Sequence, residues 1–241
     1  MKEYINTLKP YQDIDKIEIG IDEAGRGCLF GSLFVAGVIL APNFESIMTE
    51  QKIIIKDSKK LSKKRRMIAK EFIEKNVVDY YVHKVDSEVI DEKNILQATL
   101  EGMHEVVHHI QTKPNKILVD GNKFIPYKDE NDEIIEHECI IGGDNSYLSI
   151  ACASILAKTN KDLYIEQIVS DYPELEKYDL LNNSGYGTKK HIEAIKEYGI
   201  SDFHRKTFRI CNGITEKKEK KTNYKKIQTI DDLIKDFKFI K

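Results

Sequence analysis

The sequence predicts an α/β domain in which strands and helices form layers around one hydrophobic core. Short apolar runs of strand length come first in the chain, and segments with apolar residues at helical spacing are then mixed with them. A chain of 241 residues can bury about 70% of its unfolded surface, so it folds without disulfides. We assign residues 1–213 to this domain and residues 214–241 to a small appendage.

Four strands are expected from short apolar or alternating runs. Residues 17–22 are an apolar run that begins a strand, and the glycines within 23–27 end it in a turn. Residues 33–40 are apolar and β-branched, which favours a strand buried on both faces. Residues 77–85 alternate in polarity, and residues 116–119 form a short buried strand.

Four helices of the main domain follow from apolar periodicity and end signals. Residues 62–75 have apolar residues at helical spacing, and Ser62 can cap this helix. Residues 94–110 carry their apolar side chains on one face. Residues 149–158 are small and apolar, which favours a closely packed helix. The helix at 188–199 begins with a capping threonine and has a glycine past its end.

The remaining segments are polar. Residues 129–138 are acidic and loop-like, and a brief apolar run follows around Ile140. Residues 215–226 read as a lysine-rich linker. Residues 229–240 predict a short amphipathic helix that opens with a capping box.

No segment of the sequence indicates a membrane or a secreted protein. The longest apolar stretch, residues 28–41, is interrupted and shorter than the ~20 residues that span a bilayer. The N-terminus has no apolar signal core, so we expect an untargeted cytoplasmic protein. The cysteines show no paired spacing and are expected to be reduced thiols. They are Cys28, Cys139, Cys152 and Cys211.

The charge of the chain is nearly balanced but unevenly spread. Lys and Arg number 38 against 40 Asp and Glu, which argues against a histone-like basic binder. Residues 52–70 nevertheless hold nine Lys or Arg and one acid, a local balance of +8, and a second basic area lies in residues 189–209. Such runs suit a nucleic-acid backbone, although a solvated helix face explains the first run equally well.

Four acids lie beside glycine at strand or loop ends. Asp22 and Glu23 end the first strand, where side chains of neighbouring residues meet only if the turn swings the second one back. Asp120 ends a later strand, and Asp144 follows two glycines. Carboxylates brought this close repel unless a cation offsets them, and their oxygens suit Mg²⁺ or Mn²⁺. The alternative is ordinary turn chemistry, because Asp and Gly are common turn residues.

A glycine loop and a tyrosine are the other candidate binding features. Gly25, Arg26 and Gly27 follow the first acids, and such a loop can present N–H groups and one guanidinium to a phosphate and a sugar. A tight turn explains these glycines equally well. Tyr186 stands between two glycines and can stack on a nucleotide, although packing over its loop is the default for a lone tyrosine.

Six motifs together resemble the type 2 ribonuclease H family, ribonuclease HII, over residues 17–210. They occur in the family's order and are highly specific in combination. The matching segments are GIDEAGRGCLFG (20–31), KDSKKLS (56–62), VDGN (119–122), GGDNSYLSIACASILAK (142–158), GYGTKKH (185–191) and HRKTF (204–208).

The resemblance implies a ribonuclease H-like fold, with a mixed central sheet flanked by helices. It implies an endonuclease that uses Mn²⁺ or Mg²⁺, with two ions in the active complex. The substrates would be RNA–DNA hybrids and duplex DNA containing single ribonucleotides, with cleavage 5′ to the ribonucleotide that leaves 3′-hydroxyl and 5′-phosphate ends. Ribonucleotide excision repair and DNA replication are the processes it implies, and we expect a monomer.

The resemblance also assigns roles to residues of this chain. The metal-binding catalytic acids would be Asp22, Glu23, Asp120 and Asp144. The loop that senses the ribose 2′-hydroxyl would be Gly25, Arg26 and Gly27, and Tyr186 would lie at the RNA–DNA junction. Lys59, Ser146 and Lys158 would hold backbone phosphates. The 2′-hydroxyl is the local group that distinguishes RNA from DNA, which fits a loop of this kind.

The chain departs from the family pattern at three places. Ser184 replaces a usual lysine, and Lys161 replaces a usual arginine, which keeps the charge but loses the bidentate fork. The segment 214–241 exceeds the common core, so it either packs on its own domain or docks on a partner such as a sliding clamp. Ribonuclease HIII is disfavoured because its GRG position is usually GTG, and a binding module without catalysis is disfavoured because all four acids are present.

Overall fold

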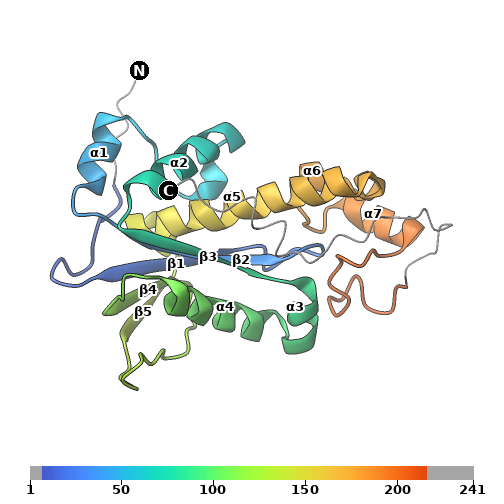
Figure 1. Ribbon diagram of the computed structural model, residues 1–241. Coiled ribbons are helices and arrows are strands. Elements are labelled where there is room, and N and C mark those ends of the chain that lie inside the picture. The colour runs from blue at the N-terminus through green and yellow to red at the C-terminus, as the bar shows by residue number, and fades with distance from the viewer. Residues whose placement is uncertain (1–6, 216–241) are drawn as a thin grey trace.

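A five-stranded sheet organises residues 7–215, the part of the chain that the computed structural model describes (Figure 1). The strand order is β3-β2-β1-β4-β5. β1, β2 and β3 pair antiparallel, whereas β4 is parallel to β1 and β5 is parallel to β4. The strands are β1 (Glu18–Ala24), β2 (Leu33–Ile39), β3 (Asp79–Val85), β4 (Lys116–Asp120) and β5 (Glu136–Ile140).

Helices cover both faces of the sheet (Figure 1). α1, α2 and α5 lie on one face, and α3 and α4 lie on the other, while α6 and α7 cluster at the far end of α5. This arrangement confirms the predicted α/β layering with a mixed central sheet. The helices are α1 (Phe44–Glu50), α2 (Lys63–Asn76), α3 (Ser87–Lys93), α4 (Ile95–His109), α5 (Leu148–Asp171), α6 (Leu180–Asn183) and α7 (Lys189–Tyr198), with short 3-10 turns at η1 (Ser58–Lys60), η2 (Gly143–Asn145) and η3 (Pro173–Tyr178).

Close contact between α5 and β1 sets the geometry of the centre. Ile19 and Ile21 belong to the apolar layer between the sheet and α4, whereas Gly20, between them in the strand, faces α5. A Cβ added to Gly20 would lie 2.5 Å from the backbone nitrogen of Ile150. The missing side chain therefore lets the first turns of α5 lie directly on β1.

Several predicted ends agree with the structure. The Ser62 side chain accepts a hydrogen bond from the Arg65 N–H and caps α2, and Thr188 caps α7 in the same way. Gly199 is the residue just past α7. All seven residues of β2 are buried, as the apolar run predicts.

Other predicted boundaries are wrong. The first strand does not turn at residue 23, because Glu23 and Ala24 pair with β2 and extend β1. Residues 129–138 are not loop throughout, since Glu136–Ile140 pair in parallel with β4. The helix expected at 149–158 continues to residue 171 as α5. α1 and α3 were not predicted.

Two further predictions concern the C-terminal residues 214–241 and membrane insertion. The helix expected at 229–240 lies outside the described residues, and the domain boundary at residue 213 stays a prediction. Within residues 7–215, none of the helices is long and apolar enough to cross a membrane.

Substituting Gly20 tests the contact between α5 and β1. We expect Gly20→Ala to lower the free energy of unfolding by about 3 kcal/mol, because the added methyl meets helix backbone that cannot move aside alone. Urea unfolding followed by circular dichroism measures the change. Gly27→Ala is the matched control, since its added Cβ would come no closer than 3.9 Å to another atom. Equal stability of the two variants would contradict the close contact.

Candidate active site

The sheet register brings the predicted acids to one end of the sheet. β1 and β4 are parallel, with Ile21 opposite Val119, so Asp22 and Asp120 are the next residues along two neighbouring strands. Asp144 lies in η2, the turn that leads into α5. The charge of Asp120 raises the pKa of Asp22, Glu23 and Asp144, so Asp120 lies within electrostatic range of all three.

Asp22 is the most deeply buried of these acids. Its carboxylate accepts hydrogen bonds from the Glu23 N–H at 2.7 Å and from the Ser154 hydroxyl on α5. The Ser154 hydroxyl in turn lies 3.1 Å from that of Ser58. Burial raises the pKa of Asp22 well above its usual value, and the charges of Glu23 and Asp120 raise it further. Ionisation of Asp22 is therefore less favourable than that of a free aspartate, and a bound cation would offset these effects.

Glu23 lies on the opposite face of β1, beside α4. It does not swing back beside Asp22, because the strand continues through Ala24. One carboxylate oxygen lies 3.3 Å from the Arg26 guanidinium, and the other is buried without a hydrogen-bond partner among the described residues. Burial raises the pKa of Glu23, and Arg26 partly offsets that rise.

Asp120 and Asp144 are joined by the loop between them. Asp120 Oδ1 accepts a 2.7 Å hydrogen bond from the Gly143 N–H. Asp144 accepts one of the same length from the Asn145 amide. Burial raises the pKa of Asp144, followed by the charges of Asp120 and Asp57.

These four carboxylates fit a hard divalent cation by their chemistry. Their ligand atoms are negatively charged oxygens, which such cations prefer. One buried oxygen of Glu23 accepts no hydrogen bond among the described residues, so its lone pairs could bind a cation. Residues 7–215 hold no set of three or more Asp, Glu, His or Cys side chains that is already gathered for a metal ion.

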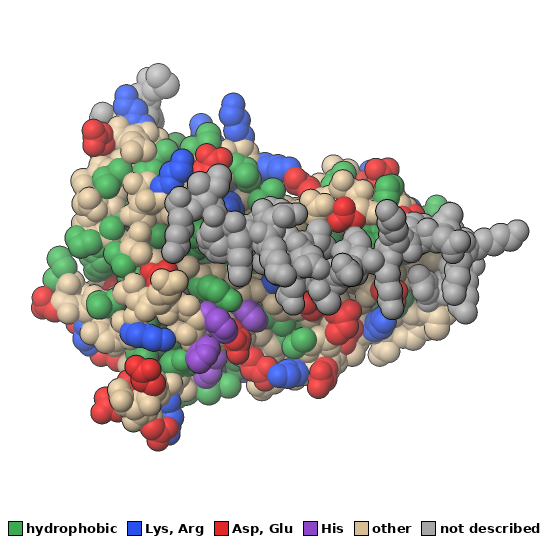
Figure 2. Space-filling model, in the orientation of Figure 1, with side chains coloured by type: hydrophobic (Ala, Val, Ile, Leu, Met, Phe, Trp, Pro, Cys, Tyr) green, Lys and Arg blue, Asp and Glu red, His purple; other side chains and the backbone are tan. Residues whose placement is uncertain are grey.

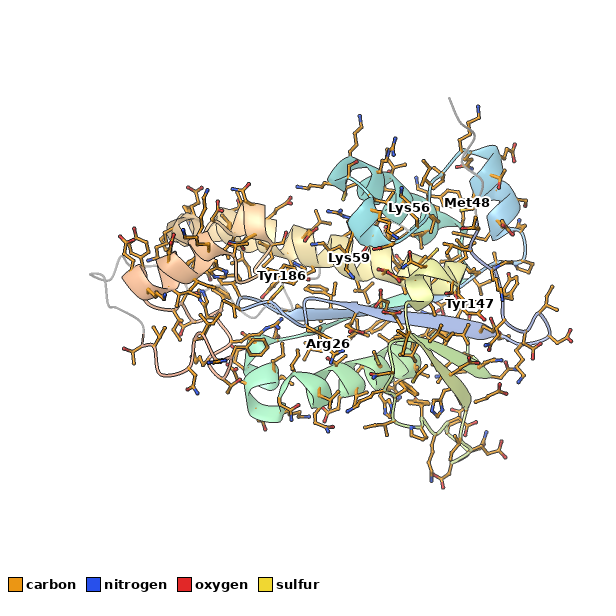
Figure 3. All side chains as sticks on the ribbon, turned by 180° about the vertical axis from the view of Figure 1, so that it is seen from behind. Arg26, Met48, Lys56, Lys59, Tyr147 and Tyr186 are labelled. Carbon is orange, nitrogen blue, oxygen red and sulfur yellow. The ribbon has the colours of Figure 1, made fainter. Side chains whose placement is uncertain are left out.

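The glycine loop follows β1 directly, with Arg26 at its exposed tip. The Arg26 side chain is 49% exposed, and Gly25 has a φ of +103°, a conformation that favours glycine. A Cβ on Gly25 would lie 2.9 Å from the Lys161 side chain. Figure 3 shows Arg26 on the β1–β2 connection, with Lys59 and Tyr186 over the neighbouring α5.

Arg205 holds this loop from inside the protein. It is fully buried, and its guanidinium donates to the carbonyls of Arg26 at 3.0 Å and Gly31 at 2.9 Å. Arg205 falls within the basic area expected at residues 189–209, but because it is buried it offers no charge to a nucleic-acid backbone. The charge pattern held no signal for this role, although Arg205 lies within the HRKTF motif.

Tyr186 lies over two lysines of α5. It is 38% exposed, and the ammonium groups of Lys158 and Lys161 stand 5.9 and 5.3 Å from its ring centroid. Lys161 is buried and donates to the Ser184 carbonyl at 2.7 Å. The two departures from the family pattern therefore meet each other, and the contact uses the backbone of Ser184.

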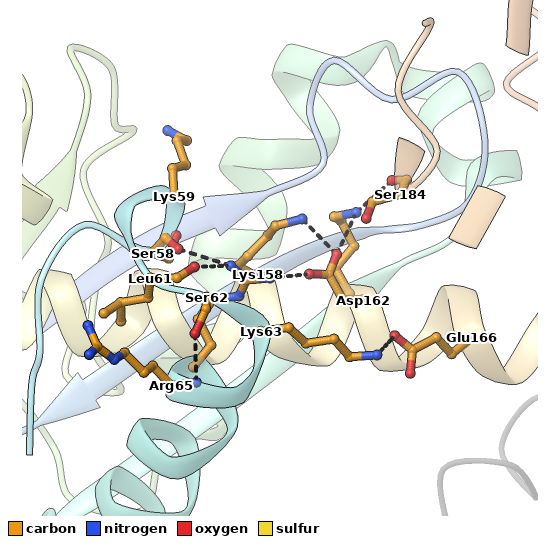
Figure 4. Close-up of polar contacts among 12 residues, drawn as sticks. Ser58, Lys59, Leu61, Ser62, Lys63, Arg65, Lys158, Asp162, Glu166 and Ser184 are labelled. Carbon is orange, nitrogen blue, oxygen red and sulfur yellow. Dashed lines mark hydrogen bonds and ion pairs between the residues drawn. The ribbon is translucent and has the colours of Figure 1, made fainter. Parts of the chain in front are cut away.

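The predicted phosphate-binding residues differ in their exposure and in the hydrogen bonds that their side chains already make. Lys59 is exposed, and its charge reaches Glu23 and Asp144. The Ser146 hydroxyl donates to the Gly142 carbonyl at 3.3 Å. Lys158 is bound to Asp162 at 2.6 Å, in a network that Figure 4 shows on α5.

The basic run at residues 52–70 is partly neutralised by acids. Arg66 pairs with Asp162 at 3.2 Å, Lys63 pairs with Glu166, and Lys70 pairs with Glu74. Figure 2 shows Lys and Arg side chains gathered at the end of the molecule where α2 lies, with acidic side chains among them. The +8 balance of the sequence therefore overstates the free positive charge.

A pocket adjoins the acids on the α4 side of the sheet. Its polar wall holds Glu23, Arg26, Asp120, Asn122 and Lys123, and its apolar wall comes from α4. Sequence reasoning did not identify this contribution of α4, because its amphipathic pattern indicates only a helix that packs on the sheet.

Comparison with known proteins places the chain in one family. The ribonuclease HII family model matches residues 19–211. A ribonuclease HII of Parabacteroides distasonis is 44% identical over 201 residues, 83% of this chain and 94% of that protein. One of Bacteroides thetaiotaomicron is 45% identical over 203 residues, 84% of this chain and 94% of that protein.

Solved structures share the fold. Ribonuclease HII of Archaeoglobus fulgidus, solved in complex with PCNA, is 30% identical, with a TM-score of 0.65 over 89% of this chain and 99% of that chain. Bst-RNase HIII, solved in complex with Mn²⁺, is 21% identical, with a TM-score of 0.58 over 80% of this chain and 67% of that chain. The predicted ribonuclease H-like fold and the resemblance stated from the motifs are thereby confirmed. The chain belongs to the ribonuclease HII family, and it is a nuclease that acts on the RNA of RNA–DNA hybrids.

Proposed function

We propose that this ribonuclease also cleaves 5′ to single ribonucleotides embedded in duplex DNA and leaves 3′-hydroxyl and 5′-phosphate ends. The observation that carries the proposal is that Asp120, at the end of β4, interacts electrostatically with the other three acids beside the glycine loop that follows β1. A reacting phosphate there would lie beside a loop able to contact the adjacent ribose.

Asp22, Glu23, Asp120 and Asp144 would hold two Mg²⁺ or Mn²⁺ ions. When bound, such ions offset the crowded carboxylates, activate water and stabilise the leaving 3′ oxygen. The Mn²⁺ complex of Bst-RNase HIII and the buried, unpartnered oxygen of Glu23 support this assignment. The chain's own contribution is to fix the carboxylates through Ser154 on α5 and the N–H groups of Glu23 and Gly143.

The loop of Gly25, Arg26 and Gly27 would recognise the ribonucleotide. Its backbone can approach a 2′-hydroxyl closely, because no side chain stands on either glycine. Arg26 would contact the adjacent phosphate, since its guanidinium is half exposed and already lies beside Glu23. Tyr186, which is 38% exposed, would stack at the junction of RNA and DNA.

Backbone phosphates would be held by Lys59, Ser146 and Lys158. Lys59 is the best placed of these, because it is exposed and its charge reaches Glu23 and Asp144. Lys158 would have to share its ammonium between Asp162 and a phosphate.

We also propose a sliding clamp as a partner of residues 214–241 and the cytoplasm as the protein's location. The PCNA complex of the Archaeoglobus fulgidus relative supports the first proposal. Four free cysteines support the second, because reduced thiols are typical of that compartment. The expected monomer stays a prediction.

Incubation with a duplex that contains one ribonucleotide tests the activity directly. We expect one incision 5′ to the ribonucleotide with Mg²⁺ or Mn²⁺, and none after EDTA, since the carboxylates need a cation to act together. Gel electrophoresis beside end-labelled markers identifies the position and the end groups. Absence of cleavage with both metals would refute the proposal.

Asp120→Asn tests the role of the central acid. We expect cleavage to fall by at least about a thousandfold, because losing a metal ligand removes several kcal/mol of transition-state stabilisation. Substrate affinity, measured by fluorescence anisotropy, should change little. Asp132→Asn on an exposed turn is the matched control. An Asp120→Asn protein that no longer folds would show that Asp120 is structural.

Arg26→Ala tests recognition by the loop. The loop should keep its path, because Arg205 holds the backbone carbonyl at residue 26 rather than its side chain. We expect cleavage at a single ribonucleotide to fall about tenfold relative to cleavage of a continuous hybrid. Lys113→Ala, an exposed lysine on another part of the surface, is the control. An unchanged ratio of the two rates would contradict the assigned role.

A further inference from the structure

Three segments far apart in the chain run side by side next to the glycine loop. Residues 28–31, which follow that loop, form an isolated bridge to Tyr186 through Cys28 and another to His204 through Phe30. The Leu29 N–H donates to the Gly185 carbonyl at 2.8 Å, and the Arg205 N–H donates to the Leu29 carbonyl at 2.9 Å. Residues 28–31 are therefore held between residues 185–186 on one side and residues 204–205 on the other.

Two buried histidines join the outer segments to each other. His191, on α7, and His204 are both fully buried, and their Nε2 atoms lie 3.1 Å apart. His191 Nδ1 lies 2.9 Å from the Tyr186 carbonyl oxygen. His204 Nδ1 lies 2.9 Å from the Ser201 backbone nitrogen. The two histidines thus link Tyr186 to the residues around His204 on one side, and residues 28–31 link the same two places on the other side.

The partners at the two ends fix the proton on each imidazole. The Ser201 N–H can only donate, so His204 Nδ1 carries no proton and its Nε2–H donates to His191. The Tyr186 carbonyl can only accept, so His191 carries its proton on Nδ1. The three bonds therefore run in one direction, from Ser201 through His204 and His191 to Tyr186.

The surroundings disfavour a positive charge on either ring. Burial lowers the pKa of His204 to about 3, and burial likewise lowers that of His191. Tyr178 packs edge-on against both rings. Asp179 is the acid whose charge reaches His191, and its effect is smaller than that of burial. A second proton on either ring would set two donors against each other.

We propose that His191 and His204 form a chain of hydrogen bonds between neutral imidazoles, called here the histidine relay. This relay positions Tyr186, and with it residues 28–31 that follow the glycine loop, for recognition of the ribonucleotide. Neither histidine would touch substrate, so both are positioning residues. The inference rests on the proposed role of Tyr186 in recognition. It adds a specific cause for the position of the Tyr186 main chain, from which the side chain projects, and the four acids do not supply this cause.

Two substitutions of similar shape separate the two bonds of His191. The amide nitrogen of His191→Asn can take the place of Nδ1 and donate to the Tyr186 carbonyl. The amide of His191→Gln reaches the Nε2 position, so it keeps the contact with His204 and loses the bond to Tyr186. His109→Gln, at the far end of α4, is the matched histidine control.

We expect His191→Gln to slow single-turnover cleavage at a single ribonucleotide about tenfold, the effect of one lost buried hydrogen bond. His191→Asn should retain more of the rate, and His109→Gln should equal the wild type. In a Tyr186→Ala background, His191→Gln should cause no further loss. Additive losses would show general destabilisation instead, and a wild-type rate in His191→Gln would also overturn the relay.

The imidazole nitrogens of the unmodified protein give a test that needs neither a variant nor activity. In ¹⁵N-labelled protein at pH 6, NMR should find His191 protonated on Nδ1 and His204 on Nε2, although a free histidine has a pKa of about 6.5. A charged ring, or a His191 protonated on Nε2, would overturn the relay. If the relay is found but no ribonucleotide-containing duplex is cut, the proposed function fails and the relay stands.

Discussion

Repulsion among Asp22, Glu23, Asp120 and Asp144 is the constraint around which this protein is arranged. Burial and mutual charge disfavour ionisation of Asp22, Glu23 and Asp144, and the fold supplies each of the four carboxylates with at least one hydrogen-bond donor. Backbone N–H groups serve two of the acids, an amide serves the third and a guanidinium serves the fourth. Because half of these donors belong to the main chain, the charge cluster persists as long as β1 and the turn before α5 keep their places.

The long helix α5 connects this cluster to the residues proposed to recognise the ribonucleotide. Its first turns lie on β1 at Gly20, Ser154 reaches Asp22, and Lys158 and Lys161 lie beneath the Tyr186 ring. One helix thus spans the distance between the four acids and the Tyr186 side chain. The spacing between the acids and Tyr186, which a substrate bound at both would have to match, is therefore fixed by a helix rather than by a loop.

The sequence indicates the features that depend on local pattern. A strand end followed by glycine predicted the position of Asp120, and capping residues predicted the starts of α2 and α7. It could not predict β5, because an edge strand with alternating glutamates resembles a polar loop. Nor could it reveal Arg205, His191 and His204, whose roles depend on partners up to 179 residues away. Their burial is decided by tertiary packing, which no local pattern records.

Both buried cations near the loops bind main-chain oxygens: Arg205 holds the carbonyls of residues 26 and 31, and Lys161 holds that of residue 184. A bond to a carbonyl does not depend on which side chain its residue carries. The backbone path of each loop is therefore independent of the side chains that the loop carries. Mutation can change the displayed side chains, as Ser184 illustrates, while the scaffold stays in register. Descendants of this protein can thus explore new substrate contacts without first losing the old geometry.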